Sequence, residues 1–257
     1  MKFDLEGQVA IVTGAARGIG KSTALLLARN GASVILDDVS ESSLRSAVNE
    51  ITSLGGIALP VRADVSDPED VRTLVSSAAN RFGRIDILVN NAGIPSPYEP
   101  IQKLDLKTWQ HILDVNLRGP ALCTREVSKI MIPRHYGRIV NVSSIFGEFA
   151  GIVGSVSYVV SKAAIIGFTK NAALELGPKG INVTAVTPGF VETEMTEYLS
   201  SDQKSRVLRQ IPVGRFATPE EIASVICFLA SPEASYMNGS IVDVHGGRSE
   251  YSLEPLD

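Results

Sequence analysis

Two side chains spaced for proton transfer lie in the stretch SVSYVVSKAAIIGF, residues 155–168. Tyr158 and Lys162 are four positions apart, so on a helix they share one face. A phenol is a poor base at neutral pH, but a neighbouring ammonium stabilises the phenolate and lowers its pKa. The pair is therefore suited to general acid/base catalysis on an alcohol or a carbonyl group. The same spacing also arises by chance at helix ends, so the pair needs further partners.

A serine precedes this helix at a position where it can help the reaction. Ser144 follows a predicted strand at residues 138–142 and lies 14 residues before Tyr158. A serine hydroxyl there can donate a hydrogen bond to the substrate oxygen and stabilise the charge that develops on it. A serine that only caps a turn or a helix is the competing interpretation.

A glycine-rich turn, TGAARGIG at residues 13–20, follows the first predicted strand and opens a helix. In that context Gly14 permits a tight turn, Gly18 lets the backbone approach a pyrophosphate, and Gly20 allows close packing of the helix. The N–H groups at the start of the helix would face the phosphates. The pattern predicts a dinucleotide site, and a turn without a ligand is the alternative.

The end of the next strand bears on which cofactor binds. Asp38 lies 18 residues after Gly20, near the spacing at which an acid accepts hydrogen bonds from the adenosine ribose. Its charge would repel a 2′-phosphate, which favours NAD, with NADP as the alternative. Arg17 favours NADP, because a guanidinium binds phosphate. We give Asp38 more weight because its carboxylate would meet the phosphate at short range; a surface acid without a ligand is the competing interpretation.

Two further polar residues end predicted strands at the same edge of the sheet, where open α/β sheets bind ligands. Asp64 follows the third strand, and it either accepts a hydrogen bond from the adenine amino group or caps a turn. Asn91 follows the fourth strand in NNAG, residues 90–93. We expect Asn91 to cross-link neighbouring strands while its loop contacts the cofactor.

Alternating strands and helices must position these residues. The strands are expected at residues 8–13, 33–38, 57–62, 85–90, 138–142, 182–187 and 240–244, with helices at 21–30, 40–54, 68–82, from about 106 to 130, around 155–176 and at 220–230. Such βα repeats predict a parallel sheet with helices on both faces. No linker divides the chain, so residues 1–257 are expected to form a single domain. The looser stretch 188–219 is interpreted as a substrate lid and 247–257 as a polar C-terminal tail.

Composition excludes several other functions. The net charge is −4 and the pI is about 5.5, so a basic surface for nucleic acid is absent. Two distant cysteines fit reduced core thiols better than a disulfide or a metal site, and no metal is expected. No apolar run is long enough to span a membrane, and the N-terminus does not read as a signal peptide. A cytoplasmic protein is expected.

Five motifs in this order resemble the short-chain dehydrogenase/reductase family: TGAARGIG, NNAG, the strand end at Ser144, YVVSK at 158–162 and TPG at 187–189. The similarity covers residues 5–247. It implies a Rossmann-type fold with a seven-stranded parallel sheet, a nicotinamide cofactor and a homotetramer or homodimer. It also implies that Ser144 orients the substrate, Tyr158 transfers the proton, Lys162 lowers the tyrosine pKa and holds the nicotinamide ribose, and Asn116 completes the site.

The resemblance also implies the residues around the cofactor and the substrate. Besides Tyr158 and Lys162, the expected cofactor contacts are Gly14, Arg17, Gly18, Ile19, Gly20, Asp38, Asp64, Val65, Asn91, Ala92, Gly93, Pro188, Gly189, Val191 and Thr193. Phe146 and Phe190 join Ser144 and Tyr158 on the substrate side. Met195, Leu199 and Phe149 could add to an apolar lid lining.

Pro120 adds a local argument about Asn116. Proline has no N–H, so the Asn116 carbonyl loses its i+4 donor and a helix through both residues should kink there. In the resembled family that carbonyl holds a water connecting the lysine to solvent. We hypothesise that Pro120 keeps the carbonyl free for this purpose.

Residues 189–231 most resemble bacterial 3-oxoacyl-[acyl-carrier-protein] reductases, which implies reduction of a 3-oxoacyl thioester. Asp38 departs from that group, which generally uses NADPH. Arg134 fits one of its two basic positions for the carrier protein, but the other position holds Leu174. A dehydrogenase of a free secondary alcohol, diol, sugar or steroid is therefore the alternative, and a non-catalytic nucleotide-binding regulator is a distant one.

Overall fold

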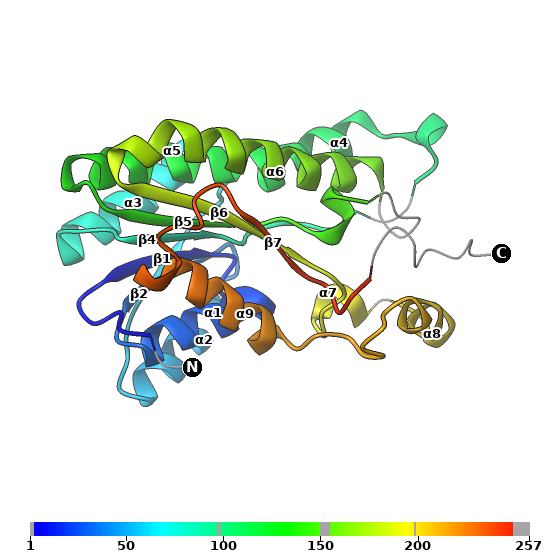
Figure 1. Cartoon of the computed structure of the whole chain (residues 1–257), viewed down its shortest axis with the longest axis horizontal. Coiled ribbons are helices and arrows are strands. Elements are labelled where there is room, and N and C mark those ends of the chain that lie inside the picture. Colours follow the sequence, from blue (N-terminus) through cyan, green and yellow to red (C-terminus); the bar gives the residue numbers. More distant parts are fainter. Residues whose placement is uncertain (1–2, 97–98, 150–154, 198, 249–257) are drawn as a thin grey trace.

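Seven parallel strands form one sheet in the order β3-β2-β1-β4-β5-β6-β7 (Figure 1). A computed structural model describes residues 3–96, 99–149, 155–197 and 199–248. The strands are β1 (Val9–Thr13), β2 (Ser33–Asp38), β3 (Ile57–Arg62), β4 (Ile87–Asn90), β5 (Gly137–Val142), β6 (Ile181–Pro188) and β7 (Ile241–Val244). The predicted Rossmann-type sheet is thereby confirmed, with strand bounds within two residues of the expected ones.

Helices cover both faces of the sheet. They are α1 (Gly18–Arg29), α2 (Glu41–Ser53), α3 (Pro68–Phe82), α4 (Leu106–Leu113), α5 (Gly119–Met131), α6 (Val156–Leu176), α7 (Glu194–Glu197), α8 (Ser201–Arg209) and α9 (Pro219–Ala230). Side chains of α1, α2 and α9 pack into one apolar cluster with Ala10 and Val12, and those of α3, α5 and α6 pack into another with Val9 and Ile11. Successive β1 residues thus face opposite layers, as strand geometry requires. No helix among the described residues is long and apolar enough to cross a bilayer.

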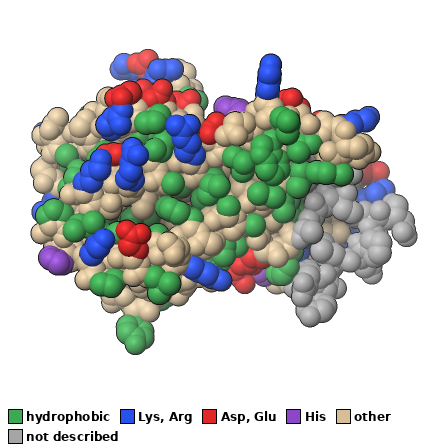
Figure 2. Space-filling view, turned by 90° about the horizontal axis from the view of Figure 1, so that it is seen from above, with side chains coloured by type: hydrophobic (Ala, Val, Ile, Leu, Met, Phe, Trp, Pro, Cys, Tyr) green, Lys and Arg blue, Asp and Glu red, His purple; other side chains and the backbone are tan. Residues whose placement is uncertain are grey.

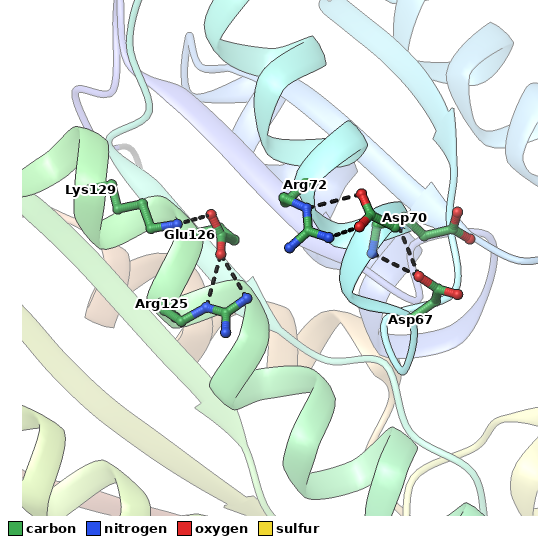
Figure 3. Close-up of polar contacts among 7 residues, drawn as sticks. Asp67, Asp70, Arg72, Arg125, Glu126 and Lys129 are labelled. Atoms are coloured by element: carbon green, nitrogen blue, oxygen red, sulfur yellow. Dashed lines mark hydrogen bonds and ion pairs between the residues drawn. The ribbon is translucent and has the colours of Figure 1, made fainter.

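Charged side chains on α3 and α5 are neutralised locally (Figure 3). Asp67 caps α3 by accepting hydrogen bonds from the first-turn N–H groups. On α5, Glu126 is buried yet lies between Lys129 at 2.5 Å and Arg125 at 2.8 Å. The hydrogen bond from Lys129, together with that from Arg125, holds the pKa of Glu126 below its usual range despite burial. These charges stabilise helix surfaces and are satisfied without a ligand.

The predicted helix through 106–130 is interrupted. Between α4 and α5 the chain forms a π-helical segment, Asp114–Arg118, and Pro120 lies at the start of α5. The interruption falls where a missing N–H at residue 120 was expected to disturb the helix. A π segment interrupts the regular α-helical hydrogen bonding without ending the helix, and it joins α4 directly to α5.

The stretch 188–219 is more regular than the sequence suggested. It contains α7 and α8, and α8 begins with a capping box in which Ser200 and Gln203 bond each other's main-chain N–H groups. Its buried side chains form a separate apolar cluster of Phe190, Leu199, Val207, Ile211 and Phe216, against which Phe146 and Leu208 pack. Met195, by contrast, is 40% exposed. We call the apolar cluster of Phe190, Leu199, Val207, Ile211 and Phe216 the lid core.

Cys123 and Cys227 are both buried, free thiols. Burial raises the pKa of Cys123 above its usual range and that of Cys227 to about 12. Both thiols are therefore protonated and unreactive, as core packing predicts. The described residues contain no cluster of three or more His, Cys, Asp or Glu side chains that could hold a metal ion.

Candidate active site

The order of strands changes direction between β1 and β4, which leaves a crevice at their carboxyl ends. The Asn91 side chain bridges the two strand ends there, because its Nδ2 donates to the carbonyls of Thr13 at 2.9 Å and Gly14 at 3.0 Å. Thr13 Oγ1 in turn accepts from the N–H groups of Asn91 and Ala92. The predicted cross-link is confirmed, and Thr13 is part of it.

The glycine-rich turn is shaped for close approach. Gly14 and Gly18 have φ values of 62° and 53°, which side chains rarely adopt. A Cβ on Gly20 would lie 2.2 Å from the Gly14 carbonyl oxygen. The first turn of α1 has no side-chain cap and no acidic residue. This uncapped, acid-free N-terminus fits a bound pyrophosphate, whereas α3, α8 and α9 carry side-chain caps.

Asp38 faces this turn from the end of β2. Its Oδ2 accepts a hydrogen bond from the Ala16 N–H at 3.3 Å, and its Oδ1 accepts from Ser40 at 3.0 Å. The neighbouring Asp37 is buried, and its pKa is raised well above the usual value by burial and by the charge of Asp38. Asp38 is therefore the acid of the pair that is oriented toward the glycine-rich turn.

Arg17 is already engaged within the chain. Its guanidinium forms an ion pair with Glu194 at the start of α7, and both side chains are exposed. Next to this pair, the space beside Gly18 is bounded by the Thr193 side chain, which would lie 3.2 Å from an added Cβ. The residues after β6 thus lie against the glycine-rich turn.

Asp64 acts as a turn residue in this structure. Its Oδ1 accepts from both the N–H and the hydroxyl of Ser66, at 2.9 Å and 2.7 Å. The side chain of Val65 is buried and would contact a Cβ placed on Gly119, so Val65 packs against α5. Ile19 packs against the core on the α1 side. Any cofactor contact by Val65 would come from its backbone.

Lys162 lies at the centre of the catalytic candidates. Its Nζ donates to the Val142 carbonyl at 2.9 Å and lies 5.8 Å from the centroid of the Tyr158 ring. The side chain is 5% exposed, and burial lowers its pKa to about 8. A Cβ on Gly93 would be 3.4 Å from this Nζ. The end of β5, the loop after β4 and the first half of α6 thus converge on one amine.

The two serines after β5 differ in their bonding. Ser143 donates from its hydroxyl to the Lys162 carbonyl at 2.7 Å, which ties the strand end to α6. Ser144 is buried, and its Oγ accepts from the Phe146 N–H at 3.2 Å. This is the turn cap considered as the alternative role. A hydroxyl that accepts one bond still has its own hydrogen to donate, so capping leaves Ser144 able to bind a substrate oxygen.

Asn116 connects three parts of the site through its side chain. Its Oδ1 accepts from the Ile94 N–H at 2.8 Å, and its Nδ2 donates to the Ile94 carbonyl at 3.0 Å and to Ser161 Oγ at 3.1 Å. Ser161 then donates to the Tyr158 carbonyl at 2.7 Å. The π-helical segment is thereby joined to the loop after β4 and to α6. Ser161 stands inside YVVSK, yet its position gave no sign of this contact.

The predicted residues at and after the end of β6 contact β7, the apolar cluster on the α9 side of the sheet and the lid core. The Gly189 N–H donates to the Val244 carbonyl at 3.0 Å, as Pro188 ends β6 beside β7. Val191 is buried and forms a bridge with Ala217. The rings of Phe146 and Phe190 meet edge to face at 5.9 Å, so the two predicted substrate residues are in contact. Residues 249–257 of the predicted tail lie outside the described residues.

A hollow of about 440 Å³ opens on the 188–219 segment. It is lined by Glu192, Thr193, Thr196, Glu197, Lys204, Leu208, Gly214, Arg215 and Phe216. Thr193 belongs to both this lining and the predicted cofactor residues. The candidates for proton transfer are grouped around Lys162 instead.

Known proteins are similar to this chain over nearly its whole length. Residues 14–249 match the family model described as enoyl-(acyl carrier protein) reductase. The 3-oxoacyl-[acyl-carrier-protein] reductase of Thermotoga maritima is 44% identical over 243 residues, which cover 95% of this chain and 98% of that protein. The cis-4-hydroxycyclohexanecarboxylate dehydrogenase of Sinomonas cyclohexanicum is 42% identical over 240 residues, 93% of this chain and 96% of that protein. The crystal structure of a short-chain type dehydrogenase/reductase from Mycobacterium marinum superposes with a TM-score of 0.93 at 37% identity, covering 96% and 98% of the two chains.

Proposed function

The chain belongs to the short-chain dehydrogenase/reductase family and is a nicotinamide-dependent oxidoreductase, and from this premise we propose that Ser144, Tyr158 and Lys162 carry out its chemistry. The observation that carries the proposal is the position of the Lys162 ammonium beside the Tyr158 ring, at the end of the strand that leads to Ser144. The distant alternative, a non-catalytic nucleotide-binding regulator, gives no reason for a buried amine in this place.

The proposed reaction interconverts a ketone and a secondary alcohol. A bound nicotinamide supplies or takes up the hydride at the carbonyl carbon. In the reducing direction Tyr158 gives its phenolic proton to the carbonyl oxygen, and the Ser144 hydroxyl donates a hydrogen bond to that oxygen. The Lys162 charge stabilises the phenolate that remains, which regains a proton from solvent. Oxidation of the alcohol runs through the same groups in reverse.

The residues that would hold the cofactor follow from the crevice. The N-terminus of α1 and the glycine-rich turn would take the pyrophosphate, and Asp38 the adenosine ribose. We propose NAD as the preferred cofactor, because Asp38 would repel a 2′-phosphate while Arg17 is engaged by Glu194. Lys162 and Asn91 with its loop would lie on the nicotinamide side, together with Pro188 and Thr193.

For the substrate we propose a 3-oxoacyl thioester, reduced to the 3-hydroxyacyl thioester. Support comes from the 44% identity to the Thermotoga maritima reductase across almost the full length of both chains. Arg134 is the basic residue that fits one of the two carrier-protein positions, and it pairs with the buried Asp86 at 3.6 Å. Leu174 is 78% exposed where a second basic residue was expected. We therefore leave a carrier protein out of the proposal.

A free secondary alcohol is the second candidate substrate. It is favoured by Asp38 and Leu174, and by the likeness to the Sinomonas cyclohexanicum dehydrogenase, whose name denotes a hydroxy acid. The test is to assay the acetoacetyl thioester of N-acetylcysteamine, as an oxoacyl substrate, beside cis-4-hydroxycyclohexanecarboxylate, a diol and a sugar, each with NAD(H) and NADP(H). Turnover of the thioester above all others supports the first candidate. Turnover of none would refute the proposed reaction class.

We also propose that the 188–219 segment is a substrate lid. Its lid core packs on Phe146, next to Ser144, and Arg17 joins its first helix to the glycine-rich turn. A segment anchored to both the substrate side and the cofactor side is suited to close over both ligands.

A second copy of the chain is the partner that we propose for the α4, α5 and α6 face. Hydrophobic side chains gather on this face, which is viewed directly in Figure 2. Leu106, Val160 and Leu174 are 72%, 38% and 78% exposed. Burying them would favour a homodimer or homotetramer. Sedimentation of the wild type and of Leu174→Glu tests this, and a monomeric wild type would contradict it.

A further inference from the structure

The chain turns sharply after β7 and brings Arg248 into the interior. Gly246 and Gly247 both have left-handed backbones, with φ values of 67° and 81°. A Cβ on Gly246 would lie 2.9 Å from the Ile211 side chain, and one on Gly247 would lie 3.2 Å from Pro212. The glycine pair therefore packs tightly beyond α8 and fixes the direction in which Arg248 leaves the turn.

Arg248 is a buried cation that has few partners in the part of the chain that the structure describes. It is 4% exposed, and its guanidinium carbon lies 5.6 Å from the Phe146 ring centroid and 5.1 Å from that of Phe190. One terminal nitrogen donates to the Gln210 side-chain oxygen at 2.9 Å. The Nε is buried with no hydrogen-bond partner, and no carboxylate of the described residues forms an ion pair with Arg248.

These surroundings compensate the charge only in part. A guanidinium has five N–H donors, and Gln210 is a single neutral acceptor. Contact with aromatic faces offsets only part of the free energy that is lost when a charge leaves water. Burial accordingly lowers the pKa of Arg248. An anion would supply the missing acceptors, and it would bind more strongly here than at the surface because water is excluded.

The guanidinium lies close to the proposed chemistry. Phe146, on which it rests, donates from its N–H to Ser144 Oγ at 3.2 Å. Phe190, its other aromatic neighbour, comes two residues after Pro188 at the end of β6. Arg248 is thus in contact with one residue beside the proposed substrate-binding serine and one beside the proposed nicotinamide site.

We propose that Arg248 binds a carboxylate carried by the substrate, so that this enzyme accepts small oxo acids and hydroxy acids. The inference rests on the proposed hydride transfer and narrows the second candidate substrate to acids. A guanidinium can place two parallel N–H donors on the two oxygens of a carboxylate, which fixes the orientation of the ligand as well as its charge. Arg248 is accordingly a specificity residue that contacts the substrate away from the reacting carbon.

The first test compares an acid with its neutral ester. Acetoacetate and methyl acetoacetate carry the same ketone, and each is reduced with NADH by the wild type, Arg248→Met and Arg248→Lys. We expect Arg248→Met to lower kcat/KM for acetoacetate by about 100-fold, mostly through KM, and to leave the ester within about threefold. Arg248→Lys should restore part of the loss. Arg209→Met, which removes an exposed charge from α8, should change neither.

The second test needs no turnover. Butyrate and butyramide have the same length, and only butyrate is charged. Because a ligand that binds the folded state raises its stability, butyrate should raise the Tm of the wild type more than butyramide does. Arg248→Met should abolish that difference. If the methionine variant does not fold, the wild type and Arg248→Lys still report whether the carboxylate is preferred.

The outcomes separate the two proposals. If methyl acetoacetate is reduced and Arg248→Met lowers kcat/KM for acid and ester equally, Arg248 only supports the lid core and the inference is wrong while the reaction class stands. If neither compound is reduced, the proposed hydride transfer to a small oxo acid or its ester is wrong. The Tm comparison alone then tests whether Arg248 binds a carboxylate. Equal Tm shifts with butyrate and butyramide in the wild type would overturn carboxylate binding.

Discussion

Lys162 Nζ lies 5.8 Å from the centre of the Tyr158 ring while it donates a hydrogen bond to the Val142 carbonyl at 2.9 Å. The strand end thus holds the amine in place, and the helix sets its distance from the phenol. Both contacts depend on burying the amine, and burial lowers its pKa to about 8. The arrangement therefore has a cost in stability that can be measured.

Lys162→Met should stabilise the fold at pH 7 and remove activity. Below the folded pKa of about 8 the ammonium is charged in both states but desolvated only in the folded one, so it destabilises the fold. A shift from 10.5 to about 8 corresponds to roughly 3 kcal/mol. The advantage of the variant should shrink as the pH rises from about 8 to 10.5, when the wild-type lysine folds neutral. Urea unfolding across this pH range measures it.

Lys170→Met is the matched control, because Lys170 is exposed on the same helix. Replacing an exposed side chain removes no desolvation cost, so Lys170→Met should not stabilise the fold at pH 7. A Lys162→Met protein that is less stable than the wild type at pH 7 would mean that the bond to Val142 outweighs the desolvation.

Asp38→Ala should shift cofactor preference toward NADPH. The carboxylate faces the Ala16 N–H of the glycine-rich turn, so its removal takes a like charge away from the 2′-phosphate. We expect the ratio of kcat/KM for NADPH to that for NADH to rise at least about tenfold. Glu41→Gln, which removes an exposed acid from the start of α2, should leave the ratio unchanged. A wild type that prefers NADPH would contradict the role given to Asp38.

Glu194→Gln should increase the use of NADPH further. The change releases Arg17, which then becomes available to a 2′-phosphate. Because the ion pair is exposed, its loss should leave the Tm nearly unchanged. We expect kcat/KM for NADPH to rise several-fold in the Asp38→Ala background, with NADH little affected. No change in that background would show that Arg17 does not reach the phosphate.

Pro120→Ala should convert the π-helical segment toward an α-helix. An alanine supplies the N–H that the Asn116 carbonyl lacks, and the turn that carries the Asn116 side chain would then shift away from Ile94 and Ser161. A small displacement of a site residue lowers kcat, here by about tenfold, and alters the pH–rate profile. Pro219→Ala is the control, since Pro219 begins α9, where no N–H is needed. An unchanged pH–rate profile for Pro120→Ala would contradict the hypothesis that Pro120 keeps the Asn116 carbonyl free.

The strands and the cofactor crevice could be predicted because short-range patterns determine them. QVAIVT is rich in β-branched residues and precedes a glycine turn, and it forms β1 from Val9. The alternation of strands and helices predicts a parallel sheet, in which the carboxyl ends of all strands lie at one edge. Asn91 and Asp38 follow or end strands, so both were expected near the glycine-rich turn. The seven strands and the Asn91 cross-link were predicted on this basis.

What could not be predicted depends on contacts between distant segments or on weak local signals. Arg17 and Glu194 are 177 positions apart, and nothing local indicates their pairing. The helix α8 was not predicted, because it is short and mostly polar. Arg248 stands in a polar stretch where an arginine is normally exposed, and only the folded lid core reveals that it is buried.

The central claim is that Tyr158 transfers the proton, and Tyr158→Phe tests it most directly. The variant keeps the ring beside Lys162 and removes only the hydroxyl. We predict that kcat falls by at least about 100-fold with every substrate turned over by the wild type, while Tm and NADH binding, followed by fluorescence titration, stay unchanged. A Tyr158→Phe enzyme that retains wild-type kcat would contradict the mechanism.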